Sequence, residues 1–243
     1  MTGQHDDSAG HAGVRLSNVR FGWTRHDRVI DIEHLQIRQG EQVLIQGASG
    51  SGKTTLLSLL AGVLAPQSGE IEIGGTRVSQ LSGSARDRFR ADHIGFIFQQ
   101  FNLLPYLTVR ENVLLPLAFS RYRAVTTASR SAAHKQADAL IEQLGLDVRT
   151  FADRPVTTLS IGQQQRVAAA RALIGTPKLL IADEPTSALD ADAREAFLRL
   201  VFTECSRAAI TLVFVSHDRS LAPLFDRAIR LADVNRIAAS AGV

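Results

Sequence analysis

Gly47-Ala48-Ser49-Gly50-Ser51-Gly52-Lys53-Thr54 is the stretch that decides the fold, because it fits the pattern G-x-x-x-x-G-K-[ST]. It follows an apolar strand predicted at Gln42–Gln46 and opens a helix predicted from Lys53 to Leu64. Small residues let successive backbone N–H groups and the positive helix N-terminus approach an anion closely. The alternative is an ordinary Gly/Ser turn, and a chance match in a chain of this length has a probability of about one in a hundred. The stretch therefore predicts a phosphate-binding loop.

Two side chains of this loop carry chemistry beyond anion binding. Lys53 is expected to neutralise the β- and γ-phosphate oxygens, and the Thr54 hydroxyl is expected to ligate Mg²⁺. The residues predicted to bind the phosphates are Gly47, Ser49, Gly50, Ser51, Gly52, Lys53, Thr54 and Thr55.

A second motif supplies acids for a metal and for water. The apolar strand predicted at Leu179–Asp183 ends in Asp183, and Glu184 follows it directly. Asp183 can hold Mg²⁺ through water, while Glu184 can orient or deprotonate an attacking water. An acidic pair after a strand, standing alone, is more often a helix cap. Beside a phosphate loop, it favours nucleotide hydrolysis.

Strands alternate with helices around these two motifs, which indicates an α/β fold with a mostly parallel sheet. Strand patterns vanish between Phe101 and Thr158, where helices are predicted at Val109–Phe119 and about Ser131–Leu144. We therefore predict a helical subdomain, about residues 101–160, inserted into the α/β core. The other predicted elements are strands at Val14–Arg20, Ile30–Ile37, Gly69–Ile73, Ile94–Phe98, Ile210–Val215 and Ala228–Leu231, and helices at Gln163–Ile174 and Ala191–Cys205.

The composition of the 243 residues is that of a globular protein, with 45 % hydrophobic residues to form a core. We predict a disordered tail over residues 1–13 and a single domain over residues 14–243. The longest apolar stretch, Leu56–Leu64, falls well short of the roughly 20 residues that span a bilayer. The N-terminus has neither a basic start nor an apolar run, so it predicts no signal peptide. A lone Cys205 cannot form an internal disulfide, which suits a reducing cytosol.

Charge argues against a nucleic-acid partner. The formal net charge is +3, and the basic residues are scattered rather than gathered in a stripe. Nucleic-acid binding normally needs such a stripe. We therefore expect no nucleic acid among the partners.

Further motifs complete a set that resembles the ABC ATPases. Leu159-Ser160-Ile161-Gly162-Gln163-Gln164-Gln165-Arg166 precedes the acid pair, and Gln99, Ser187-Ala188-Leu189-Asp190 and His217 stand in the family's order. The resemblance covers nearly everything from Val14 to Ala238, and it implies a P-loop NTPase core with an N-terminal antiparallel β subdomain. It also implies ATP and Mg²⁺ as cofactors and ATP hydrolysis as the activity.

The resemblance assigns roles to single residues outside the two motifs. Phe21 stands where the family stacks an aromatic ring on adenine, with Trp23 as a second candidate. Gln99 matches the glutamine that reaches Mg²⁺ and the water, and His217 matches the histidine that contacts the γ-phosphate. Asp190 matches the loop that crosses the dimer interface. The implied catalytic residues are Glu184, His217 and Gln99, and the implied metal ligands are Thr54, Gln99 and Asp183.

The family's signature segment implies a second subunit, most simply a homodimer. By this resemblance Ser160, Ile161, Gly162 and Gln163 face the ATP of the opposite protomer. Ile161 departs from the family pattern, which has glycine there. A β-branched residue disfavours positive φ, so we predict ordinary β or helical dihedrals for Ile161.

The run Ile94–Pro105, followed by Leu107–Val113, resembles the bacterial group of lipoprotein-releasing, macrolide-exporting and cell-division ATPases. Such subunits pair with a separate integral membrane permease, which implies a cytoplasmic protein held at the inner face of the bacterial cell membrane. Leu103 and Tyr106 are candidate permease contacts, or else they fill the core of the helical subdomain. The alternative function is a single-cassette ABC ATPase outside transport, a division regulator or an assembly factor.

Overall fold

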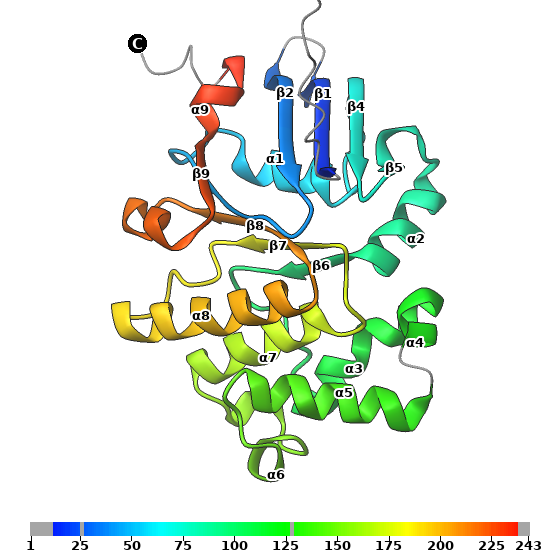
Figure 1. The fold of residues 1–243 in the computed structure, drawn as a ribbon, viewed down its shortest axis with the longest axis vertical. Coiled ribbons are helices and arrows are strands. Elements are labelled where there is room, and N and C mark those ends of the chain that lie inside the picture. The colour runs from blue at the N-terminus through cyan, green and yellow to red at the C-terminus, as the bar shows by residue number, and fades with distance from the viewer. Residues whose placement is uncertain (1–11, 25–26, 127–128, 238–243) are drawn as a thin grey trace, which may run out of the picture.

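The computed structural model describes residues 12–24, 27–126 and 129–237. Its strands form two sheets, a four-stranded antiparallel sheet in the order β2-β1-β4-β5 and a five-stranded parallel sheet in the order β6-β7-β8-β3-β9 (Figure 1). Helices lie below the parallel sheet in this view and include the segment inserted between β6 and β7. The predicted α/β fold, with an antiparallel N-terminal part and a helical insertion, is confirmed.

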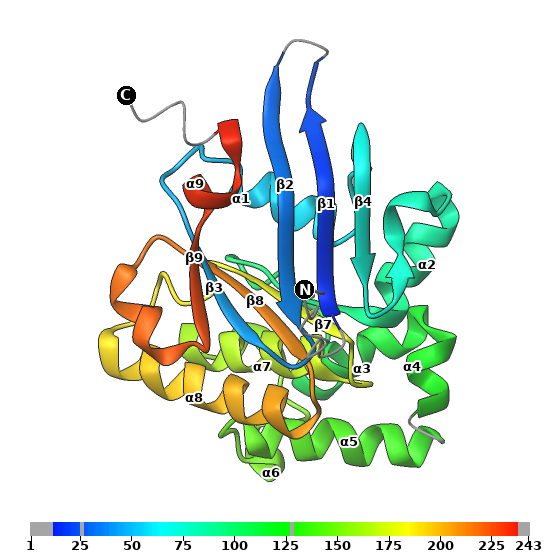
Figure 2. The same ribbon diagram turned by 45° about the horizontal axis from the view of Figure 1, so that its top comes forward.

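The antiparallel sheet holds the N-terminal part of the described chain, and its strands lie side by side in Figure 2. Ala12 pairs with Arg38, so residues 12 and 13 belong to the sheet and not to the predicted tail. Residues 1–11 of that tail lie outside the described residues. The strands are β1 (Ala12–Gly22), β2 (Arg28–Arg38), β4 (Ser68–Ile73) and β5 (Thr76–Arg77).

An irregularity in β1 changes which side chains face the core. Asn18 has a φ of 51°, and the pairing of β1 with β4 shifts between Ser17 and Arg20. A bulge of this kind reverses the inside–outside alternation of a strand. The buried side chains before it stand at even positions, and those after it, Val19 and Phe21, stand at odd positions.

The parallel sheet brings the predicted motifs to one edge. Gln46 of β3 pairs with Ser216 of β8, and Asp183 of β7 pairs with Val215 of β8. Because the strands are parallel, the segments that follow them emerge at the same edge. The strands are β3 (Gln42–Gln46), β6 (Ile94–Ile97), β7 (Leu179–Asp183), β8 (Thr211–Ser216) and β9 (Arg227–Arg230).

The predicted helices are present in the structure, with differences of a few residues at their ends, and the structure adds others. Helix α1 ends four residues before the predicted end, because Gly62 adopts a φ of 67° and its N–H closes the last turn on Leu59. The helices are α1 (Lys53–Leu60), α2 (Gly83–His93), α3 (Val109–Phe119), α4 (Arg121–Thr126), α5 (Arg130–Gln143), α6 (Val148–Phe151), α7 (Ile161–Leu173), α8 (Ala191–Arg207) and α9 (Leu231–Val234). Three 3-10 helices are η1 (Val78–Gln80), η2 (Val156–Thr158) and η3 (Arg219–Leu224).

Two hydrophobic cores cover the two faces of the parallel sheet. Val43 and Ile45 face the core shared with α1 and the antiparallel sheet, whereas Leu44 faces the core shared with α7, α8 and the helical insertion. Helix α7 packs against α3, α5, α8 and β6, so it is the common neighbour of the insertion and the sheet. Among the described residues, no helix is long and apolar enough to cross a membrane.

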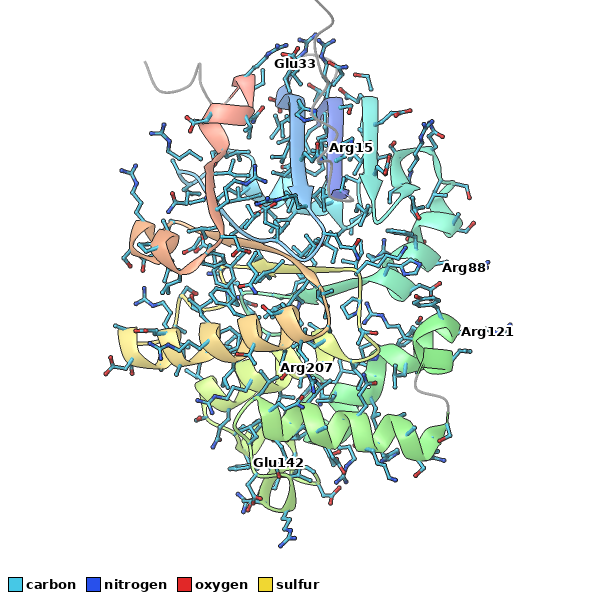
Figure 3. The ribbon with its side chains drawn as sticks, viewed as in Figure 1. Arg15, Glu33, Arg88, Arg121, Glu142 and Arg207 are labelled. Carbon is cyan, nitrogen blue, oxygen red and sulfur yellow. The ribbon has the colours of Figure 1, made fainter. Side chains whose placement is uncertain are left out.

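Charged side chains are spread over the surface. Arg15 lies on β1, Arg88 on α2, Arg121 on α4 and Glu142 on α5 (Figure 3).

Candidate active site

The loop between β3 and α1 has the backbone of an anion cradle. Gly50 and Gly52 adopt φ values of 77° and 97°, in the left-handed region that favours glycine. At Gly47 a Cβ would lie 2.5 Å from Ser51 Oγ, so only glycine fits there without a shift of Ser51. The eight residues predicted to bind phosphates thus lie in one continuous turn that opens the N-terminus of α1.

The Lys53 ammonium group lies over this cradle. Its Nζ donates to the carbonyl oxygens of Gly47 and Ala48, each at 2.8 Å. Ser51 Oγ is buried and has no hydrogen-bond partner among the described residues. A cation held by neutral carbonyls and an unused buried hydroxyl both fit a phosphate, which would accept hydrogen bonds from the two side chains.

The acid pair lies at the end of β7. Burial raises the pKa of the Asp183 carboxyl, and the neighbouring Glu184 charge raises it further, while Lys53 opposes both. The ionised form of Asp183 therefore lacks compensation, which a divalent cation would supply.

The donor set fits Mg²⁺ better than a metal held by protein alone. No group of three or more His, Cys, Asp and Glu side chains gathers anywhere in the described chain. Magnesium usually takes one or two carboxylates and completes its shell with substrate phosphates and water. Asp183, with the Thr54 hydroxyl and the Gln99 amide, matches that pattern.

Glu184 has an unusual backbone conformation. Its φ is 44°, rare for a residue with a side chain, and Pro185 follows it. Its N–H donates to Val215 O at 3.0 Å, which fixes the turn against β8. Strain of this kind persists only where the surroundings hold it, and it concentrates at functional sites.

The Glu184 side chain meets His217. Glu184 Oε2 lies 2.9 Å from His217 Nδ1, although 33 residues separate the two in sequence. The Glu184 side chain is 20 % exposed and the His217 side chain 67 %, so the glutamate is largely buried while the histidine faces solvent. Both line a cavity of about 370 Å³ at the sheet edge, with Thr186, Ser187, Arg194, Ser216, Asp218 and Arg219.

Gln99 lies in the exposed turn after β6. Strand β6 neighbours β7, and Ile97 pairs with Ala182, so Gln99 leaves the sheet beside the acid pair. The structure thus brings Gln99, Asp183 and the phosphate loop to one edge, as the motifs require.

The aromatic residues at the end of β1 differ in exposure. Phe21 is only 8 % exposed and belongs to the core beneath the antiparallel sheet, so its ring has no free face to offer a base. Trp23 is 63 % exposed and meets the Phe21 ring edge-on, with centroids 5.2 Å apart. Of the two candidates for adenine stacking, exposure therefore favours Trp23 over Phe21. The bulge at Asn18 causes this, because it turns Phe21 inward.

The signature segment forms the tip of α7. Ser160 caps the helix in a reciprocal capping box with Gln163, in which each accepts a hydrogen bond from the backbone N–H of the other. Ile161 is the first helical residue and has no positive φ, which confirms the prediction for this position. Its side chain is 56 % exposed, and the half-buried Gly162 follows it. The start of α7 is thus exposed at Ser160 and Ile161, and Gly162 adds no side chain beside them.

The signature lines a cavity that contains no residue of the phosphate loop. Ser160, Gly162 and Gln163 line this cavity of about 250 Å³ between α7 and the start of α8, together with Gly145, Leu146, Phe151, Gln165, Arg166, Leu189, Ala193 and Phe197. Asp190 caps α8 beside it and accepts a hydrogen bond from Ala193 N at 2.7 Å. No phosphate-loop residue is among those that line this cavity.

Comparison with known proteins identifies the family. The family model described as ABC transporter matches residues 31–187, which is more than half of the chain. The chain belongs to the ABC transporter family. It is an ATP-binding subunit of an ABC transporter, and it is an ATPase.

Two relatives and one solved structure illustrate the similarity within the ABC transporter family. The lipoprotein-releasing system ATP-binding protein LolD of Syntrophotalea carbinolica is 38 % identical over 93 % of this chain and 97 % of that relative. The macrolide export ATP-binding/permease protein MacB of Rhodopirellula baltica is 43 % identical over 82 % of this chain, which spans 28 % of that longer protein. A dimeric post-hydrolysis structure of the ATP-binding cassette MJ0796, from Methanocaldococcus jannaschii, was solved with ADP and Pi bound. It has a TM-score of 0.77 at 38 % identity over 89 % of this chain and 93 % of the other.

Three residues of this ABC ATPase site were missed by sequence reasoning. Arg194 and Asp218 form an ion pair that lines the same cavity as Glu184 and His217. Asp218 directly follows His217, and only the fold brings the α8 arginine to it. Gln165 donates to the carbonyl of Pro185 from within α7. Nothing in a run of three glutamines indicates which one is buried.

Proposed function

We propose that two copies of this ABC ATPase close around two ATP molecules, each held between the phosphate loop of one copy and the α7 tip of the other. The exposed start of α7 supports this arrangement, and so does the fact that no phosphate-loop residue lines the cavity of the signature. A helix N-terminus attracts anions, and the first turn of α7 contains no acidic residue that would occupy it. The described dimer of MJ0796 is a precedent among its relatives.

The site residues divide the work of hydrolysis. Lys53 exchanges its carbonyl partners for phosphate oxygens, and the loop N–H groups neutralise the rest of the charge. Glu184 accepts the proton of the attacking water, and His217 holds the glutamate oxygen at the position that the 2.9 Å contact fixes. Magnesium, when bound by Thr54, Asp183 and Gln99, would offset charge on the phosphates. Trp23 stacks on the adenine.

The partner of the ATPase is an integral membrane permease of an exporter or lipoprotein-release type, at the inner face of the cell membrane. Similarity to LolD and MacB supports this choice. Tyr106 is 77 % exposed beside the helical insertion, whereas Leu103 packs partly against the core, so Tyr106 is the better candidate contact. Copurification with an integral membrane protein tests the pairing, and recovery of soluble complexes alone contradicts it.

The Glu184–His217 contact is the observation that carries the hydrolytic mechanism, and Glu184→Gln tests it. The amide keeps the size of the side chain but cannot take a proton from water. We expect turnover to fall by about 10²–10³-fold, with ATP affinity retained and a stable ATP-bound dimer. Phosphate release, nucleotide binding and mass in solution are the three measurements. Undiminished hydrolysis by this variant refutes the role.

A further inference from the structure

Gln165 is a buried amide that connects α7, the helix that begins with the signature, to the catalytic segment, residues 183–187. It lies in the second turn of α7, is fully buried, and donates from Nε2 to Pro185 O at 2.8 Å. A carbonyl oxygen only accepts, so the amide must present its NH₂ group to Pro185. Its Oε1 has no donor within the described part of the chain. The Pro185 carbonyl is therefore the one defined polar contact of this side chain.

Pro185 directly follows the strained Glu184. A hydrogen bond to the Pro185 carbonyl therefore restrains the backbone that carries the Glu184 carboxylate. The N–H of Glu184 donates to Val215 O at 3.0 Å, and the N–H of Ser187 donates to Glu184 O at 3.3 Å. Strand β8 thus fixes one side of the turn, and Gln165 of α7 fixes the other. A residue with a φ of 44° before a proline needs such attachments to keep its conformation.

Helix α7 is also the element whose tip carries Ser160 and Gly162. A displacement of that tip would be felt one turn later at Gln165, because a helix moves as a rigid rod over so short a distance. The buried amide then passes the displacement to Pro185.

We propose that Gln165 is a positioning residue for hydrolysis. Its amide holds the Pro185 carbonyl so that Glu184 of the same chain is aimed at its water, and it links that carboxylate to the helix tip that serves the partner's nucleotide. The proposal rests on the proposed function, because Glu184 must be the group that accepts the proton.

Gln165→Met is the first test. Methionine has a similar length and favours helices, and it removes one hydrogen bond together with one unpaired oxygen, so the fold is expected to survive. We expect kcat to fall about tenfold, as for other residues that orient a reacting group, while KM for ATP and the melting temperature stay close to wild type. Gln165→Glu, which replaces the donor by an acceptor and adds a negative charge next to Pro185 O, should lower kcat further.

Gln136→Met is the matched control. Gln136 lies on α5 and also has a buried Oε1 without a partner in the described chain, and its helix packs mainly against α3, α6 and α7. This control should hydrolyse ATP as the wild type does. Equal losses in kcat from Gln136→Met and Gln165→Met would overturn the positioning role, and so would a Gln165→Met loss confined to KM or to melting temperature.

Mixing chains shows which site Gln165 serves. A limiting amount of a chain that keeps Glu184, the live chain, is mixed with an excess of Glu184→Gln chain before ATP is added. Nearly every live chain then pairs with one hydrolysis-deficient Glu184→Gln chain, the blocked partner. Single-turnover hydrolysis is then measured per live chain. The reference is wild type with excess Glu184→Gln. One test places Gln165→Met on the live chain, and the other places it on the blocked partner.

The proposal predicts that Gln165→Met slows hydrolysis about tenfold on the live chain and has no effect on the blocked partner, since Glu184 is positioned within its own chain. An equal or larger loss from the blocked partner would assign Gln165 to the signature and overturn the proposal. No loss in either mixture would overturn it as well. Full activity of the Glu184→Gln chain alone is a separate result, which refutes the proposed function instead.

Discussion

The carboxyl group of Asp183 lies where it lowers stability and assists catalysis. Burial raises its pKa first, and the charge of Glu184 adds to the effect. Between its pKa in the unfolded chain and its raised pKa in the folded one, the folded chain holds more protons on Asp183. Stability therefore falls as pH rises through that window.

Asp183→Asn should make the nucleotide-free chain more stable at pH 7, because a neutral amide avoids the penalty of a buried charge. We expect the melting temperature to rise by about 1–2 °C, and the gain to vanish as pH falls below about 4, the pKa of aspartate in an unfolded chain, because the carboxyl is then protonated in both states. Hydrolysis of ATP with Mg²⁺ should be lost at the same time. Thermal unfolding at several pH values is the measurement, and a lower melting temperature at pH 7 contradicts the argument.

Single site residues can be predicted from sequence where their type and spacing are tied to a single chemistry. The phosphate loop and the acid pair are of this kind, and the structure brings them together. Contacts between distant residues leave no such pattern, so the bond between Glu184 and His217 needed the fold. The sequence left Phe21 and Trp23 as alternatives for adenine stacking, because the pattern does not show that one bulge residue reverses the side on which Phe21 lies.

Helix α4 shows how the insertion is fastened to the sheet. Arg123 is almost fully buried, and its guanidinium group donates to the backbone carbonyls of Asp92, Ile94 and Ile174 at 3.1, 2.6 and 3.2 Å. Burial lowers the pKa of Arg123 to about 10, so it stays charged at neutral pH. One side chain of the insertion thus satisfies carbonyls at the start of β6 and at the end of α7.

Arg123→Met should loosen this attachment, since three buried carbonyls would lose their donor. We expect the free energy of unfolding to fall by about 2–3 kcal/mol and the melting temperature by about 5–10 °C. Arg121→Met is the control on the same helix, because Arg121 is exposed and points away from α4 (Figure 3), and it should change stability by less than about 0.5 kcal/mol. Thermal unfolding followed by circular dichroism compares the two, and equal shifts would count against the role of Arg123.

Elements with strong apolar periodicity were predictable, and those without it were not. The ranges Gln42–Gln46, Val109–Phe119 and Leu179–Asp183 are the same in prediction and structure. Helix α2 was missed because Phe89 is its only buried residue, so it has no apolar stripe to detect. Helices α4 and α6 span six and four residues, too few to show a helical period.

In the proposed dimer, the tip of α7 faces the partner subunit. A Cβ on Gly162 would meet nothing closer than Leu189 Cδ2 at 3.8 Å, and its backbone is helical. Packing within the chain therefore does not require glycine at this position. The proposed dimer supplies a reason for glycine here, since the partner's nucleotide would approach the tip from outside.

Gly162→Ala should separate folding from assembly. Alanine in a helical position raises the free energy of unfolding by roughly 0.5 kcal/mol, so the monomer should be slightly more stable. Combined with Glu184→Gln, the same change should reduce the ATP-dependent dimer, because the methyl group occupies space next to the partner's phosphates. Light scattering with and without ATP measures the dimer, and an undiminished dimer would contradict the proposed interface.

Gly145→Ala provides the opposite comparison. Gly145 adopts a φ of 76°, and a Cβ there would lie 2.6 Å from an Arg166 nitrogen, so this change should lower stability in the monomer itself. The pair distinguishes a glycine needed for the chain's own turn from one needed for its partner.

The exposure of Trp23 has an optical consequence. The chain contains a single tryptophan, so its indole emission comes from one place, the rim on which an adenine would rest. A solvated indole emits at long wavelength, and a stacked base quenches it. The unlabelled protein therefore carries its own fluorescent reporter of nucleotide arrival, in real time and apart from any later step.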